Sequence, residues 1–109
     1  MELKLNIFDK RQIIKTYTAE TYDIMFGTVE DIIGVIDFES IETGSNDELI
    51  KVVAKAVPKG FGLIKPLMKD IFEGLTDDEI KHARILDIAK VIVNVVKFTF
   101  EQVQTDEKN

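Results

Sequence analysis

The sequence predicts an α+β fold that is mostly helical, with an N-terminal β-hairpin followed by four to five helices packed as a small bundle. Hydrophobic and polar residues alternate at the start of the chain, which is the spacing of a half-buried strand. From residue 22 onward, apolar residues recur at steps of three and four, which is the spacing of one helix face. Residues 75–80 carry several helix-start signals together.

Composition is typical of one small globular domain. The chain has 109 residues, of which 45% are hydrophobic and 31% charged, so we expect one domain over residues 1–104 and a polar tail over 105–109. The absence of cysteine fits a reducing cytoplasm, and the first residues do not form a secretory signal. The longest apolar run, residues 91–100, is too short to span a bilayer. The net charge of −6 disfavours nucleic acid and anionic membranes as partners.

The hairpin is predicted from strands over residues 2–8 and 12–18. In the first strand, Leu3, Leu5 and Ile7 share one face. The second strand is rich in β-branched and aromatic residues. Asp9 and Lys10 would form the tight connection, and the hairpin needs a helical layer to cover it.

Two helices are predicted next. The first covers about residues 20–38, and Gly27 weakens its middle, where the helix either breaks or continues. A polar loop over residues 42–47 follows. The second helix covers about residues 46–57, because Ser45 and Glu48 have the spacing of a capping box.

A flexible break is predicted at residues 60–62, Gly-Phe-Gly, before a third helix over about residues 65–73. Pro66 fits the first turn of this helix, where a missing N–H costs nothing. Gly74 is expected to close it.

A short helix over about residues 76–82 carries the strongest local signal. The side chain of Thr76 can accept from the amide of Glu79, and Glu79 can accept from the amide of Thr76. Leu75 and Ile80 flank this capping box, as in a hydrophobic staple.

The last predicted helix, residues 84–103, is apolar around most of its circumference. Its five polar residues step by three and four and cover an arc of roughly 80° on a helix. A buried strand through residues 91–100 is the alternative, because valine and isoleucine favour strands. As a helix it is buried centrally, or part of it faces a partner or a second copy. The polar residues are Asp87, Lys90, Asn94, Lys97 and Glu101.

Residues capable of chemistry are sparse. His82 is the sole histidine, and helix capping accounts for much of the acidic cluster between residues 70 and 79, which lacks EF-hand spacing. The glycines at residues 60–62 do not continue into a dinucleotide or phosphate loop. We therefore expect no enzyme, no catalytic or metal-binding residues and no cofactor.

Four segments carry a family resemblance: residues 15–18 (KTYT), 22–33 (YDIMFGTVEDII), 65–80 (KPLMKDIFEGLTDDEI) and 97–100 (KFTF). Together they resemble the tail assembly chaperones of long-tailed, siphovirus-type phages and prophages of Gram-positive bacteria. The resemblance covers most of the chain, and it consists of helix caps and core positions, without a catalytic signature.

The resemblance implies a virion-assembly factor of the bacterial cytoplasm that is absent from the mature virion. Such chaperones bind the apolar, helical tape measure protein while tail tube protein polymerises around it. In many relatives a ribosomal frameshift gives a longer form that contacts the tube protein. A homo-oligomer stays open, as do two other classes: a small adaptor or regulatory protein that binds a folded partner, and a minor structural tail component.

A chaperone for an apolar helix needs an apolar groove. The excess apolar area of the last predicted helix and the glycine break at residues 60–62 make them the candidates for that groove. The predicted partner-binding residues are Phe61, Leu63, Val93, Val96 and Phe100.

Overall fold

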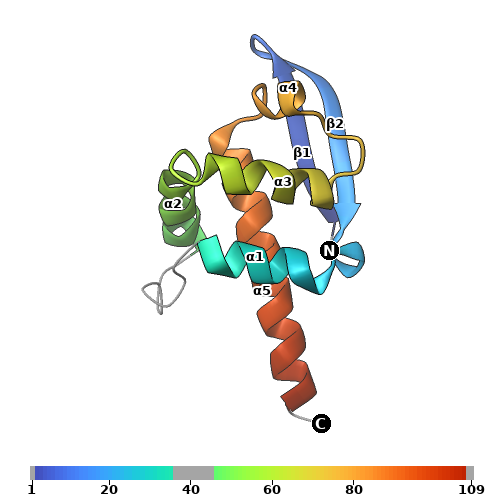
Figure 1. Cartoon of the computed structure of the whole chain (residues 1–109), viewed down its shortest axis with the longest axis vertical. Helices are drawn as coiled ribbons and strands as arrows, with labels where there is room; N and C mark the ends of the chain where they lie inside the picture. Colours follow the sequence, from blue (N-terminus) through green and yellow to red (C-terminus); the bar gives the residue numbers. More distant parts are fainter. Residues whose placement is uncertain (1, 36–45, 108–109) are drawn as a thin grey trace.

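The chain folds as predicted, into an α+β structure with an N-terminal antiparallel hairpin followed by helices (Figure 1). The computed structural model describes the backbone of residues 2–35 and 46–107. The elements are β1 (Glu2–Asp9), β2 (Gln12–Glu20), the 3-10 turn η1 (Thr21–Asp23), α1 (Phe26–Val35), α2 (Asn46–Ala56), α3 (Phe61–Ile71), α4 (Asp77–Ile80) and α5 (Ile85–Glu107).

The hairpin is closed by Lys10 and Arg11, because Asp9 pairs with Gln12. The predicted connection, Asp9 and Lys10, was therefore wrong by one residue. Lys10 has a φ of 58°, in the left-handed region that a two-residue hairpin turn requires. The register shifts further along, where Ile7 pairs with Lys15 but Phe8 pairs with Ile13. Ile14 is the extra residue of this β-bulge.

β1 is the inner strand of the hairpin. The predicted inward face is confirmed, since Leu3, Leu5 and Ile7 are at most 1% exposed. On the edge away from β2, the amide of Phe8 donates to the carbonyl of His82 at 2.9 Å. This bond and a bridge between Ile7 and Ala83 fasten the segment before α5 to the hairpin.

The helix predicted over residues 20–38 begins later than expected. The amide of Ile24 closes the turn η1 by donating to the carbonyl of Thr21, and Ile24 itself is extended (φ −80°, ψ 126°). The break therefore precedes Gly27, which lies in the first turn of α1. Residues 36–38, most of the predicted loop over 42–47 and the predicted cap at Ser45 lie outside the described residues.

α2 occupies almost the predicted range, whereas α3 starts four residues early. The amides of Leu63 and Ile64 donate to the carbonyl of Gly60 at 2.9 and 3.0 Å, so residues 60–62 start the helix instead of breaking it. Pro66 consequently lies inside α3, where it removes one backbone donor. α3 ends at Ile71 because Phe72 is extended (φ −112°, ψ 101°).

The predicted capping box is present. The amide of Glu79 donates to Thr76 Oγ1 at 3.2 Å, and the amide of Thr76 donates to Glu79 Oε1 at 3.1 Å. Leu75 and Ile80, the predicted staple pair, are both buried. The regular helix ends at Ile80, and the amide of His82 donates to the carbonyl of Glu79 in the turn that follows.

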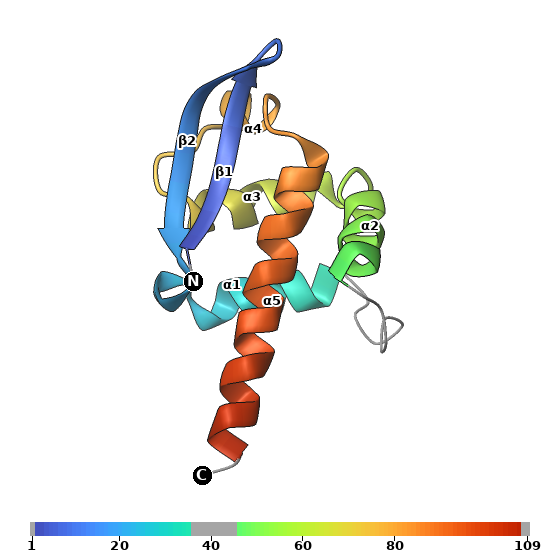
Figure 2. The ribbon, with the colours of Figure 1, turned by 180° about the vertical axis from the view of Figure 1, so that it is seen from behind.

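α5 is a helix, so the alternative strand through residues 91–100 was wrong. Figures 1 and 2 show α5 as the longest element, with α1 and α3 crossing one side of it. Lys90 on the predicted polar arc is exposed. Much of the apolar surface of α5 lies in the central core, which is the first of the two alternatives given for this helix. Its residues exposed by 3% or less are Ile88, Ala89, Val91, Ile92, Val93, Val95 and Val96.

The two ends of α5 differ from the expectation. Ile85 and Leu86, in its first turn, are 47% and 54% exposed. The helix continues to Glu107, so most of the predicted tail over residues 105–109 is helical.

Candidate docking groove between α1 and α3

The five predicted partner-binding residues do not form one surface. Val93 and Val96 are 3% exposed and belong to the core cluster, which also contains residues of β1, α2 and α3. Phe61 is half-buried against this core, and the ammonium group of Lys65 lies 5.1 Å from the centre of its ring. Leu63 is 62% exposed. The side chain of Phe100 lies outside the described residues.

Leu63 belongs to a groove between α1 and α3, which cross the same face of the molecule in opposite directions (Figure 1). The groove has a volume of about 410 Å³. It is built by one face of each helix, and its lining residues are Glu30, Asp31, Gly34, Leu63, Pro66, Leu67 and Asp70.

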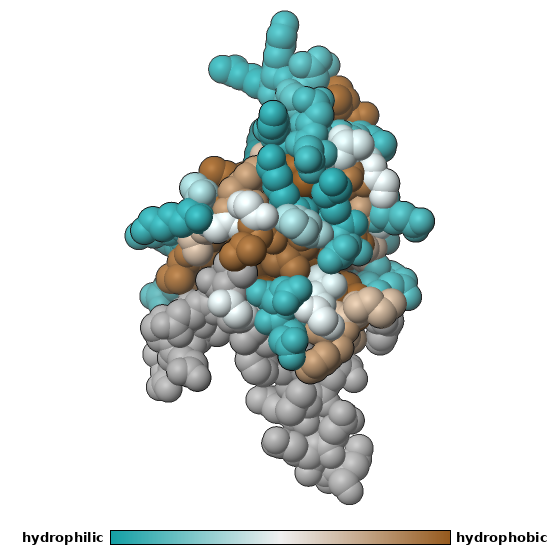
Figure 3. Space-filling view, in the orientation of Figure 1, coloured by the Kyte–Doolittle hydropathy of each residue, from teal (hydrophilic) through white to brown (hydrophobic). Residues whose placement is uncertain are grey.

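The α3 wall provides the apolar part of this groove. Leu63, Pro66 and Leu67 are spaced by three and four residues, so they lie along one stripe of the helix. Leu67 is buried beneath, while Leu63 and Pro66 are exposed. In Figure 3, apolar surface is visible between the hydrophilic side chains of this face. The groove therefore has an apolar strip open to solvent.

The α1 wall is open because Gly34 has no side chain. A Cβ added at Gly34 meets no heavy atom within 4 Å in the described part of the chain. Phe26, Glu30 and Gly34 are spaced by four residues and share one stripe of α1. Phe26, which is 78% exposed, is not one of the lining residues, but it lies on the same stripe of α1, beyond the end of the groove.

The groove is acidic. Glu30 and Asp31 stand on the α1 wall and Asp70 on the α3 wall, and the described lining contains no lysine or arginine. Among the residues that the structure describes, none of these three carboxylates forms an ion pair. They are left to interact with water or with a partner.

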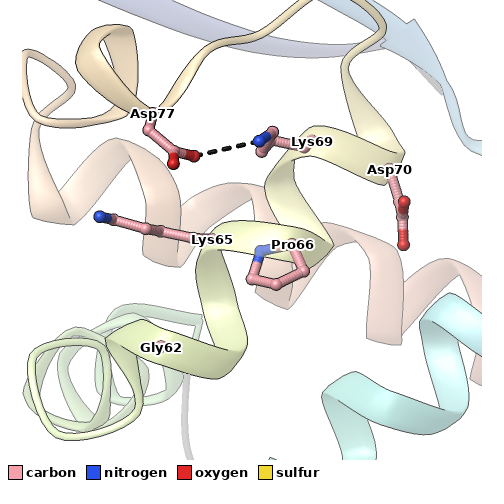
Figure 4. A pocket seen from close by; sticks show the side chains of 6 residues that line it. All are labelled: Gly62, Lys65, Pro66, Lys69, Asp70 and Asp77. Carbon is pink, nitrogen blue, oxygen red and sulfur yellow. Dashed lines mark hydrogen bonds and ion pairs between the residues drawn. The ribbon is translucent and has the colours of Figure 1, made fainter.

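The opposite side of α3 has a different charge pattern. In Figure 4, Lys65 and Lys69 point toward the α4 side, whereas Asp70 points toward α1. A hollow of about 430 Å³ lies on the α4 side and shares Pro66 and Asp70 with the groove. Lys69 donates there to Asp77 at 3.1 Å, and this hydrogen bond lowers the pKa of Asp77. An internal partner therefore neutralises much of the charge in this second hollow.

Glu79 joins the hairpin to α4. Its Oε1 accepts from the Tyr17 hydroxyl at 2.6 Å, and its Oε2 lies 3.3 Å from Lys15 Nζ. The Tyr17 hydrogen bond above all, followed by those from Thr76 and Lys15, lowers the pKa of Glu79 to about 2 against the opposing effect of desolvation. The hydrogen bonds with Tyr17 and then with Glu79 raise the pKa of Lys15. Glu79 thus stabilises the fold as an ionised carboxylate.

The described ranges, 2–35 and 46–107, contain neither a group of side chains suited to hold a metal ion nor a helix that could cross a membrane. Within them, no three His, Cys, Asp or Glu side chains are grouped as a metal site requires. His82 Nδ1 lies 2.9 Å from the carbonyl oxygen of Asp78, a local contact within the α4 turn. No helix in these ranges is long and apolar enough to cross a membrane.

Comparison with known proteins leaves the groove as the main guide to function. No family model, no curated protein and no solved structure matches the chain.

Sequence reasoning included Leu63 among the partner-binding candidates, but it did not include the acidic residues of the groove or Gly34. The spacing of Glu30 and Gly34 on one helix, and of Leu63 and Asp70 on another, is visible in the sequence. Helical spacing identifies residues that share a face, but it does not say which two faces meet. The groove depends on the packing of α1 beside α3, and that packing has no local signal.

Proposed function

We propose that this chain is a tail assembly chaperone of a long-tailed phage or prophage, which binds a helical segment of the tape measure protein and assists tail-tube assembly without catalysis. The proposal combines the family resemblance of the sequence with one structural observation, the open apolar strip between α1 and α3. An amphipathic helix lying in such a groove buries its apolar face in the way that many peptide-binding domains use.

The size of the groove suits a short stretch of a long client. The α3 part of the groove lining runs from Leu63 to Asp70, and a helical stretch of about eight residues extends roughly 12 Å at 1.5 Å per residue. The groove therefore covers about two turns of a client helix. Such a small contact falls below the area typical of permanent complexes, so binding is reversible, as a factor that leaves the finished tail requires.

Leu63 provides a direct test. The chain is co-expressed with segments of the long tape measure reading frame of the same phage genome, and the soluble fraction of each segment is measured. Leu63→Asp should abolish the gain in solubility, because a carboxylate would then occupy the apolar strip. Leu86→Asp is the matched control, since Leu86 is exposed to a similar extent but lies on α5, outside the groove lining.

The same experiment separates the other classes of function. If Leu63→Asp and Leu86→Asp have equal effects, the groove is not the client site. Mass spectrometry of purified particles distinguishes a chaperone, which is absent from them, from a minor tail component, which remains. Saturable binding of a folded host protein, with no binding of tape measure segments, would identify an adaptor instead.

The DNA sequence of the gene tests whether a longer, frameshifted form that contacts tail tube protein is made. A slippery heptamer before the stop codon, followed by a second reading frame, would support a frameshifted product. Co-purification of tail tube protein with that product, but not with the present chain, is the expected biochemical result.

A further inference from the structure

We infer that the groove between α1 and α3 selects helices that carry lysine or arginine on both sides of a narrow apolar strip. The inference depends on the proposed function for the identity of the client, whereas the charge preference follows from the groove itself. The charge preference predicts which segments of an apolar helical protein the groove binds and which segments it does not bind.

The charge preference arises from the position of the three carboxylates. Glu30 and Asp31 lie on one wall and Asp70 on the other, with the exposed apolar side chain of Leu63 in the same groove. A helix seated on Leu63 therefore has acidic side chains on both flanks. Lysine and arginine suit these flanks because their aliphatic stems cover apolar surface while their charged ends reach the carboxylates.

Asp70 is directed into this arrangement. Figure 4 shows its side chain leaving α3 toward α1, away from Lys65 and Lys69 on the opposite side. The neighbouring hollow shares Asp70 with Lys65 and Lys69. Among the described residues neither lysine forms an ion pair with Asp70, and Lys69 is paired with Asp77. A cationic client supplies the positive charge that the described lining lacks.

Gly34 gives the groove its second specificity. Because an added Cβ would enter open space beside the described residues, a large apolar side chain of the client can occupy this position. A groove that admits a bulky side chain between acidic walls binds an apolar helix differently from an open apolar patch. It requires a side chain that fills the space and cations at the flanks.

The occupant is a helix of another protein and not a second copy of this chain. The chain carries a net charge of −6, so two copies repel each other. The acidic groove adds to that repulsion wherever it faces another acidic surface. Self-association through the groove is therefore an outcome that would contradict the inference.

The test uses two synthetic helical peptides of about four turns. Both carry the same leucine strip, but the flanking residues are lysine in one and glutamate in the other. Fluorescence anisotropy of the labelled peptides with the full-length chain measures the dissociation constants. We expect the lysine peptide to bind about tenfold more tightly, because several exposed ion pairs, each individually weak, act together. Salt should reduce the difference, since exposed charges are screened.

Two sets of variants locate the effect. The combination Glu30→Gln, Asp31→Asn and Asp70→Asn should remove the preference and leave similar affinities for both peptides. The combination Glu2→Gln, Asp9→Asn and Glu73→Gln changes the net charge equally at exposed positions outside the groove and should keep the preference.

The open space at Gly34 has its own pair of variants. Gly34→Leu should weaken the binding of both peptides by filling the groove. Gly62→Leu, on the α4 side of α3, should weaken neither.

Several results would overturn the inference. Equal affinities for the two peptides contradict charge selection, and equal effects of the two triple variants would assign the preference to net charge alone. A dimer in sedimentation experiments that dissociates on peptide binding would assign the groove to a second copy.

The failure of the chaperone role and the failure of the charge preference give different results. Selective binding of the lysine peptide without binding of tape measure segments would refute the chaperone role alone. Binding of tape measure segments regardless of flanking charge would refute the charge preference alone.

Discussion

The inner side of α5 and the groove between α1 and α3 both contain apolar side chains, but the rest of the fold covers only those on the inner side of α5. Val93 and Val96 on α5 are 3% exposed, whereas Leu63 in the groove is 62% exposed. Neighbouring elements cover the valines, and no described element covers the leucine. Apolar character therefore does not distinguish the core from an open apolar surface, whereas the arrangement of the neighbouring elements does.

Carboxylates show the same contrast between the hairpin–α4 corner and the groove. Glu79 receives hydrogen bonds from Tyr17 and Thr76 and an ion pair from Lys15. Asp70 has no ion pair among the described residues and points toward α1. A carboxylate with internal partners stabilises the fold, while a carboxylate without them is available to a ligand.

The largest expected effect is that of Val96→Glu. A charged group would enter the core without a partner, so the free energy of unfolding should fall by about 3 kcal/mol or more. Urea unfolding followed by circular dichroism measures this loss. A native-like stability of the variant would mean that α5 is not covered at Val96 and would reverse the comparison above.

Glu79→Gln should give the next largest effect, and pH dependence reveals its cause. Because folding lowers the pKa of Glu79 to about 2, its contribution is complete above the unfolded-state pKa, which is about 4.3. The contribution is lost as pH falls from that value toward the folded-state pKa. In Glu79→Gln, the free energy of unfolding should be lower at pH 7 and should vary less over this acidic range.

Glu30→Gln is the control for that measurement, since Glu30 has no ion pair in the described part of the chain. Urea unfolding at several pH values should give nearly the wild-type curve for this variant. If the two variants lose the same acid-sensitive stability, the hydrogen bonds at Glu79 are not the cause.

Gly34→Ala should have a smaller effect of opposite sign. Alanine is favoured over glycine in a helix by roughly 0.5–1 kcal/mol, and the added Cβ meets no described atom within 4 Å. Thermal unfolding should therefore show a modest gain in stability. A loss of stability would mean that the α1 wall is closed at Gly34 and the groove narrower than described.

Leu63→Asp should change stability least. Surface substitutions of this kind usually alter the free energy of unfolding by less than about 0.5 kcal/mol, while the variant should lose client binding. Urea unfolding and co-expression solubility are measured on the same protein. A large loss of stability would place Leu63 with Val96 in the core and remove the distinction between the two surfaces.

The sequence predicted those elements whose signals are local. The alternation of Leu3, Leu5 and Ile7 identified β1, and the pair Thr76 and Glu79 identified the start of α4. The predicted start of α3 was wrong because Gly60 and Gly62 suggested a flexible break. In the structure the carbonyl of Gly60 accepts the first hydrogen bonds of the helix. The low helix propensity of glycine was therefore outweighed there by hydrogen bonding in the folded chain.

The groove between α1 and α3 was less predictable, because it depends on packing between distant segments. The sequence offered both Val96, on the predicted last helix, and Leu63, beside the predicted glycine break, as candidates, because both are apolar. The positions of α1 and the core elements separate them in the structure. The acidic walls were missed for the same reason, since Glu30 and Asp70 are forty residues apart in the chain.

The β-bulge at Ile14 makes the length of β2 adjustable at that position. Elsewhere in a strand, loss of one residue turns every following side chain to the opposite face. Without Ile14, Phe8 still faces Ile13 and Ile7 still faces Lys15, because Ile14 is the residue that the register passes over. A one-residue deletion at Ile14 should therefore keep Tyr17 opposite Leu5 and within reach of α4, whereas deletion of Thr16 should separate them.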